Sequence, residues 1–403
     1  MPAALAQSQD APPQASLLTF APGQIYWQRF GHNALLLRYA NGGTQVFNYG
    51  VFDFQQENFL LNFARGRMRY ELAIEPLQAN LAAYAAEGRW VWEQRLALSL
   101  QQRRQLQEYL LWNALPENAP YAYDYFRANC STRVRDALDQ VLGGALRAQL
   151  ENRMSDLSYR QDVRGAMAPL PALQWGMDWL IGPAGDQPLN LWQKAYLPLE
   201  LMEAVRAVQR LETDGRLAPL VLAEGWLYRA GEAPGIATAG RLAEGQSPFF
   251  FLSGTGLGLL LAGLALGAPR ARLARIGFSM VAGILSLLTA IAGGLIVAAW
   301  LWSDHWIIAD NFNALLATPL SLLLLPGLRD VAVARRPGAV RLAALILAMA
   351  ALGASASLSG ISAQQSANWV ALWLPVHFSI ALALYWLSRR PRPVAANAAA
   401  IRP

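Results

Sequence analysis

Five long apolar stretches in the C-terminal part of the chain constrain its fold more than any other feature. Each has about the 17–25 residues that an α-helix needs to cross a bilayer. The third contains two Asn and one Pro, which favours a broken or re-entrant segment. The sequence therefore predicts an all-α membrane domain of about five transmembrane helices, over Phe249–Ala268, Ile276–Trp302, Asn311–Leu328, Val340–Leu358 and Trp369–Leu387.

Basic residues are distributed unevenly along the chain. From Pro248 onward there are 11 Arg, no Lys and 3 acidic residues, so the basic excess belongs to the apolar half and does not indicate a nucleic-acid partner. All 11 Arg fall in alternate loops or in the tail, and the loops 303–310 and 359–368 contain no Lys or Arg. The positive-inside rule places the Arg-containing loops and the C-terminus in the cytoplasm. We therefore expect residues 1–247 to lie outside the cytoplasm.

The first residues resemble the end of a signal peptide. Ala4-Leu5-Ala6 before Gln7 matches the small-residue pattern of a cleavage site, and the alternative is an Ala-rich disordered tail. The apolar stretches set the next boundary. We expect three parts: a signal-peptide remnant or disordered tail over residues 1–17, an extracytoplasmic domain over 18–247 and a transmembrane helical domain over 248–403.

One cysteine and one histidine stand out in the extracytoplasmic part. Cys130 is the only cysteine of the chain, and His32 is the only histidine before the apolar half. A cysteine with a histidine is the usual combination of nucleophile and base. The alternative is a buried structural cysteine and a core histidine, which is common for isolated residues of these types.

Local patterns place both residues at the start of an element. His32 precedes a strand, and Asn129 is a natural N-cap for a helix that Cys130 opens. Apolar residues at helical spacing follow Cys130, and two glycines end the pattern. The predicted elements are strands over 34–39 and 44–49 joined by a turn at Asn41-Gly42-Gly43, and helices over 71–86, 96–115 and from Cys130 to Gly143-Gly144.

This placement suits thiol chemistry. The helix dipole and free backbone N–H groups at a helix N-terminus favour a thiolate and can receive an oxyanion. His32 would take the thiol proton. A third polar group usually orients such a histidine, and Asn48 and Asp53 are both candidates. Their alternatives are a polar residue at a strand end for Asn48 and a turn cap for Asp53.

Arginines near an apolar segment are candidates for binding a lipid phosphate. Arg65 and Arg67 follow a run of Phe and Leu residues, and Arg binds phosphate through two hydrogen bonds. The alternative is a solvated helix face whose arginines pair with Glu57 and Glu71. Arg133, one turn after Cys130, would stabilise the thiolate or bind phosphate, or instead form a surface ion pair with Asp136 or Asp139.

Two histidines of the apolar half are further candidates. His305 lies in an outward loop and is a candidate for a second contributor to the site or for lipid contact, and the alternative is an interfacial polar residue beside Trp302 and Trp306. His377 lies within a span, where a polar residue is costly unless it faces the bundle interior. No metal-ligand spacing and no cofactor motif is visible, and Gly254-Thr255-Gly256-Leu257-Gly258 reads as close helix packing.

The order of the two reactive residues resembles that of circularly permuted papain-like enzymes, which include the lecithin:retinol acyltransferase group and permuted NlpC-type hydrolases. Here His32 precedes Cys130, whereas in papain the cysteine comes first. A closer resemblance covers most of residues 20–200, to the family of the Lnb N-terminal periplasmic domain. The motifs that carry it are Phe30-Gly31-His32, Asn48-Tyr49-Gly50 with Phe52-Asp53-Phe54, Phe63-Ala64-Arg65-Gly66-Arg67, Tyr123-Asp124-Tyr125-Phe126, Asn129-Cys130-Ser131-Thr132-Arg133-Val134-Arg135-Asp136 and Ser158-Tyr159-Arg160. The apolar half is similar to that family's C-terminal region through His305, Asn311, Asn313 and Pro319.

The resemblance implies an α+β permuted papain-like periplasmic domain on a bacterial inner-membrane protein. It also implies acyl transfer from a phospholipid donor, through a thioester on Cys130, to the terminal amine of a lipoprotein or another amine acceptor. No cofactor is expected. Two alternatives remain open at this point: an amidase or peptidase acting on cell-wall peptide, and a non-enzymatic membrane scaffold in which Cys130 is structural.

Overall fold

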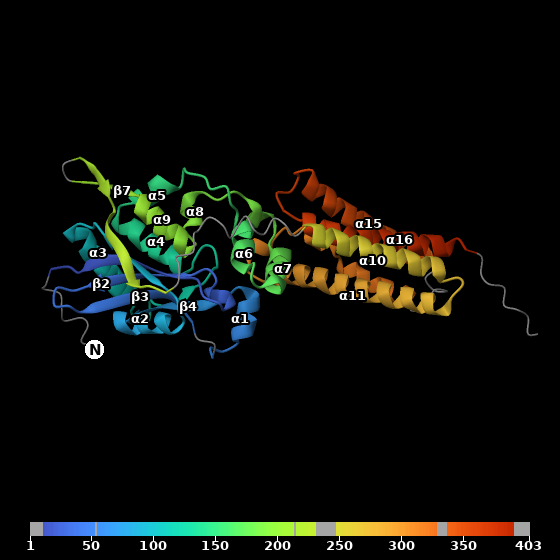
Figure 1. Ribbon diagram of the computed structural model, residues 1–403, viewed down its shortest axis with the longest axis horizontal. Helices are drawn as coiled ribbons and strands as arrows, with labels where there is room; N and C mark the ends of the chain where they lie inside the picture. The colour runs from blue at the N-terminus through green and yellow to red at the C-terminus, as the bar shows by residue number, and fades with distance from the viewer. Residues whose placement is uncertain (1–10, 53–54, 213–214, 231–246, 329–336, 391–403) are drawn as a thin grey trace, which may run out of the picture. The chain divides into compact units, whose positions relative to one another are not determined.

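The computed structural model describes residues 11–52, 55–212, 215–230, 247–328 and 337–390, and the chain divides into two compact units. The first is rich in β-structure and the second is helical (Figure 1). The first unit comprises Met1–Asp178, Gly185–Ala243 and Ser303–His305, and the second comprises Trp179–Ala184, Glu244–Trp302 and Trp306–Pro403.

A seven-stranded antiparallel sheet forms the centre of the first unit. Its strand order is β6-β4-β3-β2-β1-β5-β9, and a separate two-stranded hairpin consists of β7 and β8. The strands are β1 Gln14–Phe20, β2 His32–Arg38, β3 Thr44–Val51, β4 Arg69–Glu75, β5 Val91–Leu96, β6 Tyr121–Ala122, β7 Gln209–Leu211, β8 Leu217–Pro219 and β9 Val221–Tyr228.

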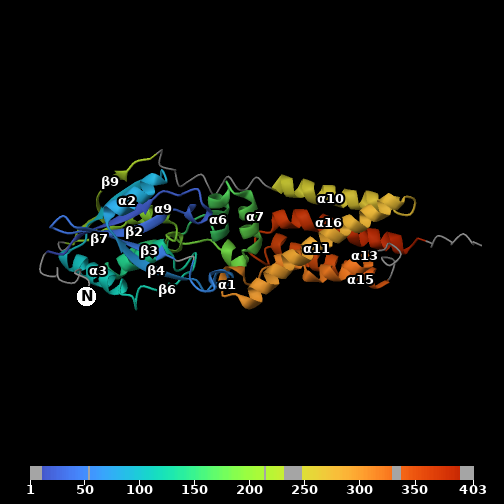
Figure 2. The same ribbon diagram turned by 90° about the horizontal axis from the view of Figure 1, so that it is seen from below.

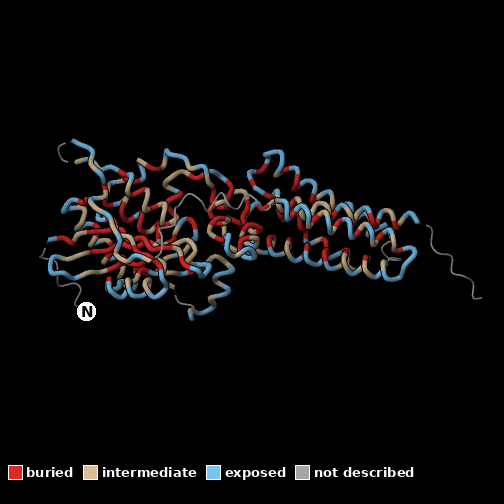
Figure 3. Tube along the Cα trace, viewed as in Figure 1, coloured by how far each residue is buried: buried red, intermediate tan, exposed pale blue. Residues whose placement is uncertain are grey.

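The central strands are buried on both faces, which explains their nearly continuous apolar sequences. Leu17 and Leu35 pack on one face with helix α4, whereas Leu18 and Leu36 pack on the other face with helix α2. Figure 3 shows buried stretches of chain, in red, through the middle of the sheet. Side chains alternate between the two faces along each strand, so consecutive residues of one strand pack into the cores on opposite faces of the sheet.

Helices cover both faces of the sheet (Figure 1). Helix α2 covers one face, and α3, α4, α5 and α9 supply the core of the other. The helices of this part of the chain are α1 Phe59–Arg65, α2 Leu77–Ala86, α3 Leu100–Asn113, α4 Cys130–Val141, α5 Ala145–Leu150, α6 Tyr159–Met167, α7 Pro171–Leu180, α8 Leu191–Lys194 and α9 Pro198–Ala207, with 3-10 turns η2 Tyr26–Gln28 and η3 Pro183–Asp186.

The predicted hairpin and the helix after Cys130 are confirmed, but two other predicted helices need correction. The segment predicted as a helix over 71–86 is strand β4 followed by α2, and Pro76 marks the boundary because it lacks the N–H that a continuing helix needs. The helix predicted over 96–115 begins only at Leu100, where Ser99 caps it. Leu96 instead ends strand β5.

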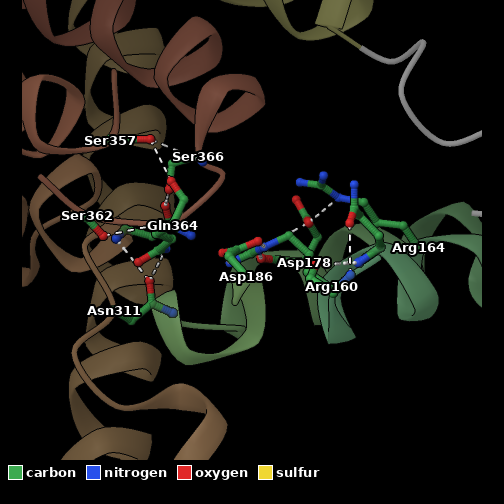
Figure 4. A network of polar contacts seen from close by, with 12 residues as sticks. Arg160, Arg164, Asp178, Asp186, Asn311, Ser357, Ser362, Gln364 and Ser366 are labelled. Atoms are coloured by element: carbon green, nitrogen blue, oxygen red, sulfur yellow. Dashed lines mark hydrogen bonds and ion pairs between the residues drawn. The ribbon is translucent and has the colours of Figure 1, made fainter. Parts of the chain in front are cut away.

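A buried ion-pair network holds α6 to the segment after it. Arg160 is fully buried, and its guanidinium lies between the carboxylates of Asp178 and Asp186, at 3.2 and 2.8 Å (Figure 4). Arg164 donates to the same Asp178. Removing one partner would leave a buried charge uncompensated, at a typical cost of about 3–5 kcal/mol. The conspicuous run Ser158-Tyr159-Arg160 is thus a helix cap followed by a structural ion pair.

The second unit contains four helices long and apolar enough to cross a membrane, among the described residues. Helix α16 packs against both α10 and α15 (Figure 2). Their outward residues are apolar, as expected for side chains facing lipid, and Leu259 and Leu352 are 69% and 61% exposed. The helices are α10 Ser247–Gly267, α11 Arg272–Trp302, α15 Pro337–Leu358 and α16 Ala367–Ser388.

The third predicted span is not one helix, so the described part of the chain contains four long helices where about five were predicted. It consists of α12 Asn313–Leu316, η6 Pro319–Leu324 and α13 Leu325–Leu328, after a 3-10 turn η5 Trp306–Ile308. The break falls at Ala317 and Thr318, which are both extended. Pro319 explains it, because a proline disfavours the helical conformation of the residue before it.

Small and polar side chains hold the second unit together. A Cβ on Gly254 would lie 2.3 Å from the Ala371 carbonyl oxygen of α16, so the predicted close helix packing is confirmed. Asn311 donates to the carbonyl oxygens of Trp179 and Leu180 and accepts from Gln364 (Figure 4). The first two bonds satisfy carbonyl oxygens at the C-terminal end of α7, where the last turn of a helix leaves such groups without a partner inside the helix. His377 is buried and donates to the Leu316 carbonyl oxygen at 2.9 Å.

Candidate functional site

Cys130 opens α4, and Asn129 caps that helix as predicted. The Asn129 side chain accepts from the Thr132 N–H at 2.9 Å, and the Thr132 hydroxyl accepts from the Asn129 N–H at 2.8 Å. The Asn129 amide also donates to the carbonyl oxygens of Tyr125 and Tyr196 at 2.9 and 3.0 Å. The start of the helix is therefore fixed by bonds in both directions along the chain, and the thiol lies at the positive end of the helix dipole.

The thiol lies where β2 and β3 separate. The two strands pair only from Leu35 with Phe47 to Arg38 with Thr44, which leaves the first residues of β2 unpaired with β3. A Cβ on Gly50 of β3 would lie 3.6 Å from the Cys130 Cβ. From the other side, the backbone N–H of Asn33 on β2 donates toward the sulfur. The opening between the strands thus brings Cys130 against the residue that follows His32.

A second bond fixes this approach. The Ser131 hydroxyl lies 2.8 Å from the Asn33 side-chain oxygen, and the Asn33 amide donates to the Thr19 hydroxyl at 2.9 Å. Ser131 and Asn33 are both fully buried. These bonds join the first turn of α4 to β2 and to β1, so that the position of Cys130 relative to the His32 backbone is set by the fold.

His32 is oriented by Asn48 across the separated strands. Its Nε2 lies 3.1 Å from the Asn48 Oδ1, and the Asn48 Nδ2 donates to Glu75 at 3.0 Å. A carboxylate can only accept, so the amide oxygen of Asn48 must face His32 and Nε2 must carry the ring proton. Nδ1 is then the unprotonated nitrogen of the neutral ring, available as a base.

The imidazole and the thiol belong to different faces of the sheet. His32 and Asn48 point with Ala34 and Val46 toward α2, where the His32 ring lies beside Phe20 at 5.4 Å between centroids. Cys130 packs with the core on the α4 face. Among the described contacts, hydrogen bonds join His32 to Asn48 and the sulfur to Asn33, and none joins the imidazole to the thiol directly.

Burial sets the protonation of both groups. It raises the pKa of the Cys130 thiol above its ordinary value, although the N–H groups of Asn33, Ser131 and Cys130 itself oppose this. Burial lowers the pKa of His32 to about 4, the hydrogen bond that His32 donates to Asn48 opposes this, and the charge of Arg89 lowers the pKa further. The expected stabilisation of the thiolate by the helix N-terminus is thus present but smaller than the desolvation. Thiol and imidazole are both neutral at neutral pH.

Arg133 lies over the aromatic rings beside the thiol. Its guanidinium carbon is 4.9 Å from the Tyr121 ring centre and 5.6 Å from that of Tyr49. The buried Nε atom has no hydrogen-bond partner among the residues that the structure describes. Asp136, one of the two carboxylates considered as its partner, pairs with Arg135 at 2.7 Å. Arg133 is therefore held by ring contacts and keeps a buried donor close to Cys130.

The predicted lipid-binding residues lie around α1. Arg67 pairs with Asp304 at 2.7 Å, rather than with Glu57 or Glu71. The Asp304 N–H donates to the Arg65 carbonyl oxygen, and the His305 Nε2 donates to the Phe63 carbonyl oxygen at 3.0 Å. The short segment 303–305 therefore binds the C-terminal end of α1, which brings Arg65, Arg67 and His305 together.

Gly66 is required at this junction. Its φ of +73° ends α1 in the left-handed region, and a Cβ there would lie 3.1 Å from the His305 Nδ1. Next to it, α1 exposes apolar side chains, since Leu60 is 78% and Phe63 37% exposed. An exposed apolar helix that ends in arginines is typical of a surface that contacts lipid.

One predicted residue of the site lies outside the described residues, and two residues of the site were not predicted. Asp53 lies outside the described residues, so of the two candidates for the third group the described contacts concern Asn48 alone. Glu75 and Asn33 were not predicted, because their roles depend on strand register and not on local sequence. A carboxylate at the end of a strand and just before Pro76 was the only local signal for Glu75.

The site provides no evident metal ligands. Among the described residues, no three His, Cys, Asp or Glu side chains are grouped so as to hold an ion. The chemistry that the arrangement supports is that of a thiol, an oriented imidazole base and backbone N–H groups at a helix N-terminus.

Two protein-family models match the chain, and the first of them includes this site. The model of the Lnb N-terminal periplasmic domain matches residues 3–164, which include His32, Asn48 and Cys130, and the model of the Lnb transmembrane domain matches residues 255–364. No curated protein and no solved structure matches the chain. The chain is thus a membrane protein with an N-terminal periplasmic part, and it belongs to the Lnb family.

Proposed function

We propose that the protein is a cysteine-dependent acyltransferase that moves a fatty acyl chain from a phospholipid, through a Cys130 thioester, to the N-terminal amine of a lipoprotein. The observation that carries the proposal is the arrangement at the separated end of β2 and β3. There the thiol at a capped helix N-terminus accepts from the backbone N–H of Asn33, the residue that follows His32, and the Nε2 proton of His32 is fixed by an amide. Cysteine, histidine and amide in these roles favour a permuted papain-like domain.

The residues account for both half-reactions. The Nδ1 atom of His32 takes the Cys130 thiol proton as the sulfur attacks the ester carbonyl carbon of the donor. The tetrahedral intermediate expels the lysophospholipid alkoxide, which receives that proton from His32, and a thioester remains. The amine then attacks the thioester carbonyl and gives a proton to His32. The amide forms, and the released sulfur regains its proton from His32.

The N–H groups near the sulfur have a defined part in this scheme. The backbone N–H of Cys130 and that of Asn33 point toward the sulfur, so they are close to the oxyanion of the intermediate. Because the thiol and the imidazole do not share a hydrogen bond in the described structure, Nδ1 meets the sulfur only after the side chains reorient. Catalytic hydrogen bonds often tighten in this way when substrate binds.

The surroundings of the site support the proposal that the substrates are lipids. The exposed apolar face of α1, with Arg65 and Arg67 at its end, offers acyl-chain and phosphate contacts on one element. Tyr70, Tyr123 and Tyr125 form a chain of ring contacts from the neighbourhood of Cys130 to His305 and Phe63. The membrane domain keeps both lipid-anchored substrates near the enzyme.

The arginines support a cytoplasmic C-terminus in the bacterial inner membrane. This orientation needs the broken segment Asn313–Leu328 to cross the bilayer. At 1.5–2 Å per residue, its length is roughly 25–30 Å, close to the hydrocarbon thickness of about 30 Å. The break itself is packed inside the unit, as Ala317 and Thr318 are buried, which is where irregular backbone is tolerated within a membrane.

A transfer assay tests the function. The full-length protein is reconstituted with a phospholipid that has perdeuterated acyl chains and with a diacylglyceryl-cysteinyl peptide. We expect the peptide to gain one deuterated acyl chain on its amine with release of an equal amount of lysophospholipid. Cys130→Ala should abolish transfer, and Leu211→Ser, on the exposed β7–β8 hairpin, should not change it. Transfer that persists in Cys130→Ala contradicts the proposal, and Cys130-dependent cleavage of a cell-wall stem peptide without acyl transfer would establish the amidase instead.

A further inference from the structure

Glu75 makes a contact that the proposed mechanism does not yet use. It is the last residue of β4, and its Oε2 accepts from the side-chain amides of both Asn48 on β3 and Asn80 on α2. Both amides are buried, at 5% and 3% exposure, whereas Glu75 itself reaches solvent. One carboxylate oxygen therefore satisfies two buried donors, next to the histidine of the site.

The direction of the Asn48 amide decides which nitrogen of His32 carries the proton. With the amide oxygen toward His32, the ring must donate from Nε2, and Nδ1 is free to accept. If the amide were reversed, its NH2 group would face Nε2. The ring would then hold its proton on Nδ1 and could not take a proton from the thiol there. Asn48 alone does not choose between these states, because an amide offers an oxygen or an NH2 group with the same shape.

We propose that Glu75 is a positioning residue that fixes the tautomer of His32 by holding the Asn48 amide in one direction. This inference rests on the proposed function for its catalytic consequence, but not for the tautomer itself. What matters is that Glu75 accepts a hydrogen bond. Its charge is not required, so a glutamine at this position still presents an oxygen to Asn48.

A structural role for Glu75 predicts something different. Glu75 lies just before α2, and its bond to Asn80 holds the first turns of that helix to β4. If this were its only role, Asn80→Leu would have the same effect as loss of Glu75, and the His32 tautomer would not respond. Glu71 lies on the same strand, is also exposed and contacts neither Asn48 nor Asn80 among the described residues, so it provides a matched control.

The test measures the tautomer directly. The full-length protein in detergent micelles is labelled with 15N-histidine, and the His32 signals are assigned with His32→Asn. In the wild type and in Glu75→Gln we expect the proton on Nε2. Glu75→Lys places a donor beside Asn48, reverses the amide and should move the proton to Nδ1. Glu75→Leu removes the acceptor and should give a mixture, and Glu71→Lys and Asn80→Leu should leave Nε2 protonated.

Kinetics provide the second readout. Glu75→Lys and Glu75→Leu should lower kcat of acyl transfer at least tenfold with little change in KM, and Glu75→Gln should restore most of it. A Glu75→Lys protein that retains the Nε2 proton, or a Glu75→Gln protein as impaired as Glu75→Leu, overturns the inference. If the tautomer follows Glu75 but the wild type transfers no acyl chain, the inference stands and the proposed function fails.

Discussion

The resting thiol and imidazole should both be neutral, and this can be tested by the pH dependence of alkylation. Burial raises the pKa of Cys130 above its ordinary value and lowers that of His32 to about 4. Each unit of difference between two pKa values corresponds to about 1.4 kcal/mol, so moving the proton from sulfur to imidazole costs several kcal/mol in the resting protein. A thiolate–imidazolium pair is therefore a minor species at neutral pH.

The assay is the second-order rate of iodoacetamide addition to Cys130 from pH 5 to pH 10, followed by intact mass. Because only the thiolate reacts, the rate should rise about tenfold per pH unit between pH 6 and pH 8 and show no plateau there. His32→Asn should have nearly the same profile, since the imidazole is not charged in this range. A plateau that begins below pH 7 and disappears in His32→Asn would refute the reasoning, because it is the signature of a preformed ion pair.

Three further perturbations follow from the same contacts. Because the pKa of His32 is lowered to about 4, its contribution to stability is complete above pH 6.5 and is lost as the pH falls toward 4. Thermal unfolding should therefore show roughly 3 kcal/mol less acid destabilisation in His32→Asn than in the wild type. Asn129→Ala removes the cap of α4 and should lower the free energy of unfolding by about 1–2 kcal/mol, measured by denaturant titration; an unchanged midpoint would contradict the role of the cap. An environment-sensitive probe on Leu60→Cys in a Cys130→Ser protein should be quenched by spin-labelled lipids in nanodiscs, and the same probe on Leu211→Cys, at a residue that is also well exposed, should not; equal quenching would count against lipid contact by α1.

The sequence predicted best where short-range signals decide the structure. The turn at Asn41-Gly42-Gly43 fixes the β2–β3 hairpin, and Asn129 with Thr132 fixes the start of α4. Strand β4 was misread as helix because its pairing with β3 is set by residues about 25 positions away, which no local period reveals. The break before Pro319 was foreseen from composition, but its 3-10 geometry depends on packing within the bundle.

Local sequence signals also identified part of the site, whereas the contacts set by strand register could not be predicted. Cys130 and His32 were found because each is rare, and the structure places them at neighbouring strand and helix ends. Asn48 and Asp53 could not be separated by sequence, whereas the side-chain alternation of β3 puts Asn48 on the same face as His32. Glu75 reaches Asn48 only through the register of β3 with β4, so its place in the site could not be predicted.

The most direct test of the account is whether Cys130 carries an acyl chain. Full-length protein incubated with phospholipid in the absence of an amine acceptor is measured by intact mass spectrometry, beside Cys130→Ser. The account predicts a mass increase of one fatty acyl group on the wild type that hydroxylamine removes and that Cys130→Ser lacks. A wild-type protein that gains no acyl group while Cys130 remains open to iodoacetamide, or an increment that persists in Cys130→Ser, would contradict it.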